Sequence, residues 1–251
     1  MNTGLITLEI LGMIFILAFA GLMLVVALLG RKRPARRLRE IPAFAKLNRA
    51  VGLAVEAGNR LHMSLGRGQL LSQQSAVGFV GLSILDRIAR WTSFSDQPPI
   101  ATSGEGTLST LSQDTLQKAA RSVGADYDPS RGRLAGITPF SYAAGVMPVI
   151  HDEGVGANML IGSFGSEVAL INEAGERAGS LTLAGTDDLS GQAVLFATTQ
   201  EPLIGEETYA GGAYLGASGL HDASLVAQDV FRWVIIGLIL ISVVLKLAGV
   251  L

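Results

Sequence analysis

Residues 5–30 read LITLEILGMIFILAFAGLMLVVALLG, and the chain continues directly into the basic segment 31–39, RKRPARRLR. About 20 apolar residues in a helix cross a hydrocarbon core of about 30 Å. Residues 10–30 have that length, with Glu9 left at one interface. The sequence therefore predicts an N-terminal membrane span followed by a basic segment at the membrane surface.

The positive charges follow this span, because residues 1–8 contain no lysine or arginine. Basic residues favour the cytoplasmic side of a span, and the apolar run is too long for the core of a signal peptide. We therefore expect the N-terminus outside and the chain from residue 31 onward in the cytoplasm. The side chains expected to contact lipid headgroups are Arg31, Lys32, Arg33, Arg36, Arg37 and Arg39.

A second apolar run, residues 230–251, predicts a second span. Trp233 suits a membrane interface, and Lys246 can reach the far headgroups. Both termini then lie outside and the central region lies in the cytoplasm. The expected regions are a transmembrane helix at 5–30, a basic collar and amphipathic helix at 31–61, a cytoplasmic α/β domain at 62–229 and a transmembrane helix at 230–251.

Charge is unevenly distributed along a chain whose net charge is −2. Residues 31–60 carry nine Lys/Arg and two acids, whereas residues 134–229 carry one arginine and twelve acids. This asymmetry, together with glycines that permit close packing, favours a homo-oligomer of copies packed side by side. Nucleic acid binding is not expected, because no aromatic residues interleave with the basic ones. The absence of cysteine excludes disulfides, thiolate catalysis and cysteine-bound metal.

From residue 62 onward, short apolar strands alternate in several cases with helix-like segments. The predicted strands are 62–65, 99–102, 159–163, 180–184 and 194–198, and the predicted helices are 75–91, 107–123, 166–177 and 205–216. This alternation predicts an α/β fold with a mainly parallel Rossmann-like sheet and covering helices. The loop between the last two predicted strands, 185–191, could also form a hairpin.

Three further segments are assigned from their periodicity and turn residues. Residues 41–61 have apolar side chains at spacings of three and four, which predicts an amphipathic helix lying against the bilayer or the domain, with core packing favoured. Residues 127–137 contain proline and glycines and are expected to form a loop. Residues 139–150 are apolar but too short for a third span, so we expect a buried helix.

Loops rich in Gly, Ser and Thr follow four of the predicted strands. In an open α/β sheet such loops gather at the carboxyl edge, where amides at helix N-termini favour anions. A small-ligand or nucleotide site there would use Ser64, Gly66, Gly68, Ser103, Gly104, Gly106, Ser163, Gly165 and Thr186. The same residue types are common in ordinary tight turns, and no loop has a Walker or Gly-x-Gly-x-x-Gly pattern.

Signals for catalysis or metal binding are less specific. His151-Asp152-Glu153 could bind a divalent cation only from a loop, because adjacent side chains diverge in regular structure. The acid pairs Asp187-Asp188 and Glu206-Glu207 could serve hydrolase or transferase chemistry, but no nucleophile motif accompanies them. We therefore predict no catalytic residue, no metal site and no cofactor, and an enzyme is the least favoured interpretation.

The segments 36–44 (RRLREIPAF), 50–58 (AVGLAVEAG) and 61–66 (LHMSLG) resemble an uncharacterised family of bacterial, Chloroflexota-like membrane proteins with two spans and a cytoplasmic domain of unknown function. The resemblance implies a bacterial inner-membrane protein and no particular activity. We expect a structural or scaffolding protein that forms a homo-oligomer, with lipid and other membrane proteins as further partners. The alternative is a membrane-tethered sensor of a small ligand or nucleotide.

Overall fold

The structure is a computed structural model that describes residues 2–30, 39–69, 75–92, 94–216 and 219–249. The chain divides into two compact units. One is Arg39–Ala217, and the other combines the terminal segments Met1–Leu38 and Ser218–Leu251.

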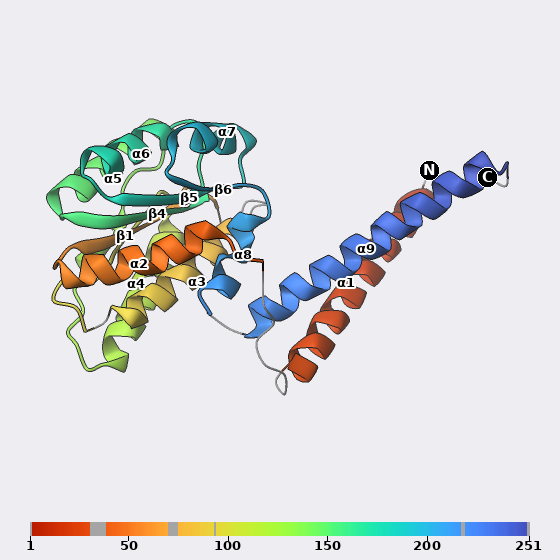
Figure 1. The fold of residues 1–251 in the computed structure, drawn as a ribbon, viewed down its shortest axis with the longest axis horizontal. Helices are drawn as coiled ribbons and strands as arrows, with labels where there is room; N and C mark the ends of the chain where they lie inside the picture. Colours follow the sequence, from red (N-terminus) through yellow and green to blue (C-terminus); the bar gives the residue numbers. More distant parts are fainter. Residues whose placement is uncertain (1, 31–38, 70–74, 93, 217–218, 250–251) are drawn as a thin grey trace. The chain divides into compact units, whose positions relative to one another are not determined.

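The larger unit is built on a six-stranded sheet in the order β3-β2-β1-β4-β5-β6 (Figure 1). The strands are β1 (Arg60–Gly66), β2 (Ile100–Ser103), β3 (Gly132–Leu134), β4 (Val155–Ser163), β5 (Leu181–Gly185) and β6 (Glu201–Leu203). Every neighbouring pair is parallel. This is the strand order of doubly wound sheets, in which the winding reverses between β1 and β4. The prediction of an α/β fold with a parallel sheet is confirmed.

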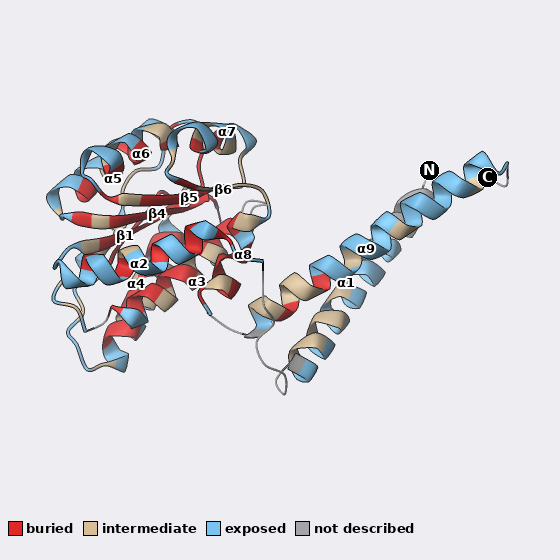
Figure 2. Cartoon of the chain, in the orientation of Figure 1, coloured by how far each residue is buried: buried red, intermediate tan, exposed pale blue. Residues whose placement is uncertain are grey.

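Helices cover both faces of the sheet (Figure 1). One face carries α2 (Pro42–Glu56), α3 (Ser75–Trp91), α4 (Gly106–Ser122) and α8 (Glu207–Tyr214). The other face carries α5 (Pro139–Asp152), α6 (Val168–Arg177) and α7 (Leu189–Thr198), and the 3-10 turn η1 (Pro129–Arg131) leads into β3. Because helices lie on both sides, the central strands are almost wholly buried (Figure 2).

Successive residues of a strand point to opposite faces, so β1 serves two different environments. Leu61, Met63 and Leu65 join the apolar core that also holds residues of α2, α3 and α4. The intervening His62 and Ser64 are buried as well. They hydrogen-bond on the side of the sheet that α5 covers.

The amphipathic helix packs on the domain. α2 begins at Pro42, whose missing N–H suits the first turn of a helix. Its buried residues are Ala43, Phe44, Leu47, Val51 and Ala54, and they face β1, β4 and β5. Of the two interpretations, packing against the domain is confirmed. The helix is shorter than the predicted 41–61, because it ends at Glu56 and Leu61 belongs to β1.

Most of the other predicted elements are present, and helix 75–91 has the predicted bounds. The predicted strand 194–198 is wrong, because these residues belong to α7. Asp188 caps this helix, its Oδ1 accepting from the amide of Gly191 at 2.9 Å. The chain therefore turns into a helix after β5, and the alternative of a hairpin at 185–191 is wrong too.

Two edge strands lie where none is predicted. β3 falls within the segment 127–137, which is expected to be a loop, and β6 follows α7. Each has three residues, too few for a periodicity to show in the sequence. Their pairing with β2 and β5 defines them as strands.

The second unit is a pair of adjacent helices, α1 (Asn2–Gly30) and α9 (Gly219–Leu247). The rings of Phe15 and Phe19 lie 4.9 and 5.7 Å from that of Phe231. By length and composition, Glu9–Leu29 and Leu220–Leu247 could each cross a membrane. The helix α9 begins well before the predicted span at 230–251.

Candidate functional site

The Gly- and Ser-rich loops meet at the carboxyl edge of the sheet. Gly66, Ser103 and Ser163 are the last residues of β1, β2 and β4, and Thr186 follows β5 directly. The order β2-β1-β4-β5 makes these four strands neighbours. All nine predicted ligand residues therefore lie at, or within a few residues of, one continuous stretch of sheet edge.

Amides at the ends of these strands are already hydrogen-bonded within the chain. Gly104 N donates to Gly66 O at 2.8 Å, and Arg67 N donates to Ser163 O at 3.0 Å. An anion site of the phosphate-loop kind needs free amides that converge on the ligand. Here the amides continue the strand pairing beyond the sheet and hold the loops together.

An internal ion pair occupies the centre of this edge, between β1 and β4. Arg67 Nη2 and Nε donate to Glu167 Oε1 at 2.9 and 3.1 Å. The amide of Gly165 donates to the same oxygen at 3.1 Å. Glu167 is buried, whereas Arg67 remains partly exposed. A carboxylate of the chain itself thus lies at the strand-order reversal, where doubly wound sheets bind their ligands.

Close packing accounts for two of the predicted glycines without a ligand. A Cβ at Gly66 would lie 2.6 Å from the backbone N and O of Ser163, and Gly66 has a φ of +69°. A Cβ at Gly104 would lie 2.4 Å from Arg67 Cγ. Gly106 is different, because a Cβ there meets nothing within 4 Å. Of these three glycines, the fold itself requires Gly66 and Gly104.

Two polar atoms at this edge are buried without a hydrogen-bond partner in the described part of the chain. They are Ser103 Oγ, at the end of β2, and Asp187 Oδ1, beside Thr186. A buried polar group left unpaired costs about 1–3 kcal/mol. Thr186 itself is satisfied, since its hydroxyl accepts from Phe164 N at 2.9 Å. Both atoms are shielded from solvent, so a bound molecule reaches them only if the surrounding loops open.

A chain of buried hydrogen bonds crosses the sheet on the α5 face. His62 Nδ1 lies 2.7 Å from Asn158 Oδ1, and Nε2 lies 2.9 Å from Thr102 Oγ1. The hydroxyl of Tyr142 lies 2.6 Å from Ser64 Oγ and 3.4 Å from Thr102 Oγ1. We call these five residues, all of them buried, the polar chain.

Burial sets the charge state of the polar chain. It lowers the pKa of His62 to about 4, against the smaller opposing effect of the Asn158 hydrogen bond. Burial also raises the pKa of the Tyr142 phenol. Both side chains are therefore neutral near pH 7. Because no member is exposed, the polar chain can position β1, β2, β4 and α5 but cannot touch a substrate.

The sequence reasoning missed Tyr142 and Asn158. Asn158 lies in β4 among apolar neighbours, and such an isolated polar residue in a buried strand is a signal that could have been used. Tyr142 offers no such signal, because an aromatic residue is common on the packed face of a helix that covers a sheet. Its partner Ser64 becomes visible only when α5 packs on β1.

The His-Asp-Glu triplet does not converge on a common point. Glu153 pairs with Arg60 at 3.3 Å and with Arg133 at 2.5 Å. His151 and Asp152 are exposed, and they contact each other at 3.0 Å. The described residues contain no group of three or more His, Asp or Glu able to hold a metal ion.

In each of the two acid pairs, Asp187-Asp188 and Glu206-Glu207, one residue makes a structural contact. Hydrogen bonds from Ser190 and Gly191 lower the pKa of the cap residue Asp188, and Glu207 pairs with Arg39.

Arg39 is one of the residues expected at lipid headgroups. The other five, Arg31, Lys32, Arg33, Arg36 and Arg37, lie outside the described residues. Lys46 also pairs with Glu201, so the basic and acidic parts of the sequence neutralise each other in part within one chain.

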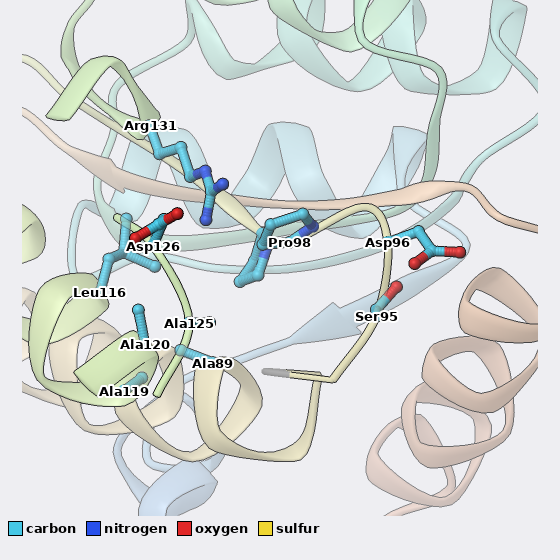
Figure 3. A pocket seen from close by; sticks show the side chains of 11 residues that line it. Ala89, Ser95, Asp96, Pro98, Leu116, Ala119, Ala120, Ala125, Asp126 and Arg131 are labelled. Carbon is cyan, nitrogen blue, oxygen red and sulfur yellow. The ribbon is translucent and has the colours of Figure 1, made fainter. Parts of the chain in front are cut away.

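A hollow of about 220 Å³ lies at the opposite, amino edge of the sheet (Figure 3). It is lined by the ends of α3 and α4 and by the segments that lead into β2 and β3, including Pro98, Pro99, Ala119 and Arg131. None of the predicted ligand residues lines it. A groove of about 350 Å³ also separates the outer surfaces of α5 and α6.

Comparison with known families and proteins gives one match. The family model described as "Domain of unknown function (DUF6754)" matches residues 5–251. No curated protein and no solved structure matches the chain. The family match spans the sheet and both terminal helices.

Proposed function

We propose that this chain, which belongs to the DUF6754 family, is a membrane-anchored scaffolding protein whose α/β domain assembles identical copies into a homo-oligomer. The long apolar helices α1 and α9 suit a membrane anchor. The basic residues that follow α1 favour a cytoplasmic position for the domain at a bacterial inner membrane, with both termini outside.

The observation that carries this proposal is a pair of exposed apolar clusters at opposite edges of the sheet. The first cluster, at β3 and the start of α5, is Leu134, Ile137 and Phe140, which are 51, 73 and 70 % exposed. The second cluster, on α7, is Leu189 and Phe196, which are 82 and 74 % exposed. Because α7 joins β5 to the edge strand β6, each copy carries both halves of a head-to-tail contact.

The geometry of the two clusters suits contact through side chains. Leu189 and Phe196 lie two helical turns apart and so share one face of α7. Burying each such side chain stabilises a contact by about 1.5–3 kcal/mol. The edge strands β3 and β6 are short, which limits backbone pairing between copies. Head-to-tail contacts close into a ring when the rotation permits, and a shared membrane keeps the copies in one orientation.

The absence of cysteine makes a direct crosslinking test available. Full-length Phe140→Cys and Phe196→Cys variants with different tags are co-expressed, and disulfide formation is measured in isolated membranes after a mild oxidant is added, because thiols stay reduced in the cytoplasm. We expect the two variants to crosslink with each other, because their side chains lie in the two clusters. Neither should crosslink with itself. Phe94→Cys is the matched control, since Phe94 is 83 % exposed near the amino edge and should not react with Phe196→Cys.

Native mass spectrometry of the gently extracted protein then gives the number of subunits. A ring of three or more copies is the expected result. A monomer without crosslinked product contradicts the proposal. Self-crosslinking of Phe140→Cys indicates a two-fold dimer and contradicts the head-to-tail contact.

A membrane-tethered sensor of a small ligand or nucleotide is the second candidate function. The unpaired Ser103 Oγ and Asp187 Oδ1 favour it, because a ligand at the carboxyl edge would satisfy them. The internal hydrogen bonds of Arg67 and Gly104 count against it. The same mass spectra separate the two functions. A sensor retains a small-molecule mass that Ser103→Ala loses, whereas a scaffold retains none.

A further inference from the structure

Alanines and prolines, which cannot move to fill the space, form much of the wall of the hollow at the amino edge (Figure 3). Ala89, Ala119 and Ala120 are buried and have no side-chain rotamers to change. Pro98 and Pro99 fix the backbone that leads into β2. A cavity of roughly 150 Å³ can hold a benzene molecule, so this hollow of about 220 Å³ has room for a small organic molecule.

One cation lines this mainly apolar wall. In Figure 3 the Arg131 side chain points toward the space between Asp126 and Pro98. Its guanidinium makes no hydrogen bond or ion pair with any described residue, but, after the hydrogen bonds from Ser130, its charge helps to lower the pKa of the exposed carboxylate of Asp128. Arg133 is its counterpart outside the hollow, where it donates to Ser130 O at 2.7 Å and pairs with Glu153. Of these two neighbouring arginines, only Arg131 is available to a ligand.

We propose that the hollow binds a small organic carboxylate through Arg131. A guanidinium presents parallel N–H groups that match the two oxygens of a carboxylate. The apolar part of the ligand would pack on the alanines and prolines. Inorganic phosphate would satisfy the guanidinium but leave these walls uncovered. Asp96 and Asp126 also line the hollow, and both repel an anion, so they lower the affinity.

The test uses the full-length protein in detergent, with isobutyrate as the probe and calorimetry or saturation-transfer NMR as the measurement. We expect isobutyrate to bind saturably and isobutyramide, which has the same shape without the charge, to bind far more weakly. Arg131→Gln should weaken binding at least about tenfold. Arg133→Gln is the matched control and should leave the affinity unchanged. Asp126→Asn should tighten binding several-fold, because a nearby negative charge is removed.

Several results would overturn the proposal. Binding that survives Arg131→Gln lies elsewhere on the protein, and the absence of saturable binding removes the site. If phosphate binds as tightly as isobutyrate, the site binds anions but does not select for the apolar part of an organic carboxylate. Circular dichroism establishes whether Arg131→Gln is folded. If it is not, Asp126→Asn decides, because an unchanged affinity contradicts the proposal.

Discussion

The two faces of the central strand β1 are equally buried but are stabilised in different ways. On one face Leu61, Met63 and Leu65 pack in an apolar core. On the other, His62 and Ser64 hydrogen-bond within the polar chain. Apolar burial is non-directional, whereas hydrogen bonds need defined distances and angles. We infer that the apolar face contributes most of the stability and that the polar chain fixes the position of α5 on the sheet.

The largest expected effect is on the apolar face. Leu65→Ala removes a fully buried side chain and leaves a cavity, so the free energy of unfolding should fall by about 2–5 kcal/mol. Chemical denaturation followed by circular dichroism measures this loss, which should be similar at pH 5 and pH 7, as no titrating group is changed. Leu53→Ala, on the exposed side of α2, is the control and should change stability by less than about 0.5 kcal/mol. Equal losses in the two variants would contradict the comparison.

The next effect is a dependence on pH that only the polar face can produce. The unfolded chain protonates His62 below its ordinary pKa of 6.5, whereas the folded chain does so only below about 4. Unfolding therefore takes up a proton between these values, and stability falls as the pH drops through this window. The full effect is about 3 kcal/mol between pH 7 and pH 4.

Two variants isolate the contribution of His62 to this dependence. His62→Gln should flatten the change in unfolding free energy between pH 7 and pH 4. His151→Gln should retain it, because His151 is exposed. If His62→Gln keeps the full dependence on pH, another group is responsible and the assignment is wrong.

The smallest expected effect concerns the link between α5 and β1. Tyr142→Phe removes one hydroxyl and leaves Ser64 Oγ buried without this partner, at a cost of about 1–3 kcal/mol. Adding Ser64→Ala should then cost less than it does alone, because the two hydroxyls bond each other. A double-mutant cycle by chemical denaturation measures this coupling. Strictly additive losses would show that the hydrogen bond contributes nothing to stability.

The elements that could be predicted are those whose sequence pattern extends over several turns or contains a buried run. Helix α3 and the long apolar helices belong to this group. The prediction of a strand at 194–198 is wrong because a short run of four apolar residues and a threonine fits a strand and a buried helix equally well. The cap at Asp188 favours a helix, because its side chain accepts a hydrogen bond from the amide of Gly191 in the first turn, before the apolar run begins. The sequence does not predict the strands β3 and β6, because each is recognised as a strand only by its backbone pairing with the neighbouring strand.

The candidate site also has features that the sequence predicts and features that it does not. The gathering of the Gly- and Ser-rich loops at one edge follows from a general rule for parallel sheets. The ion pair between Arg67 and Glu167 joins residues far apart in the chain, and no local pattern indicates it. The position of Arg131 at the hollow also follows from the packing of α3 and α4 beside β2, and no local pattern indicates it.

By itself, the sequence determined that this protein has two long apolar terminal helices, an α/β domain between them and no cysteine. These properties depend on composition and on periodicities carried by contiguous residues. Only the tertiary structure decided which polar groups are paired, which amides are occupied and where a hollow remains. Those properties arise where segments distant in the sequence come within hydrogen-bond distance, and the sequence does not encode such distances locally.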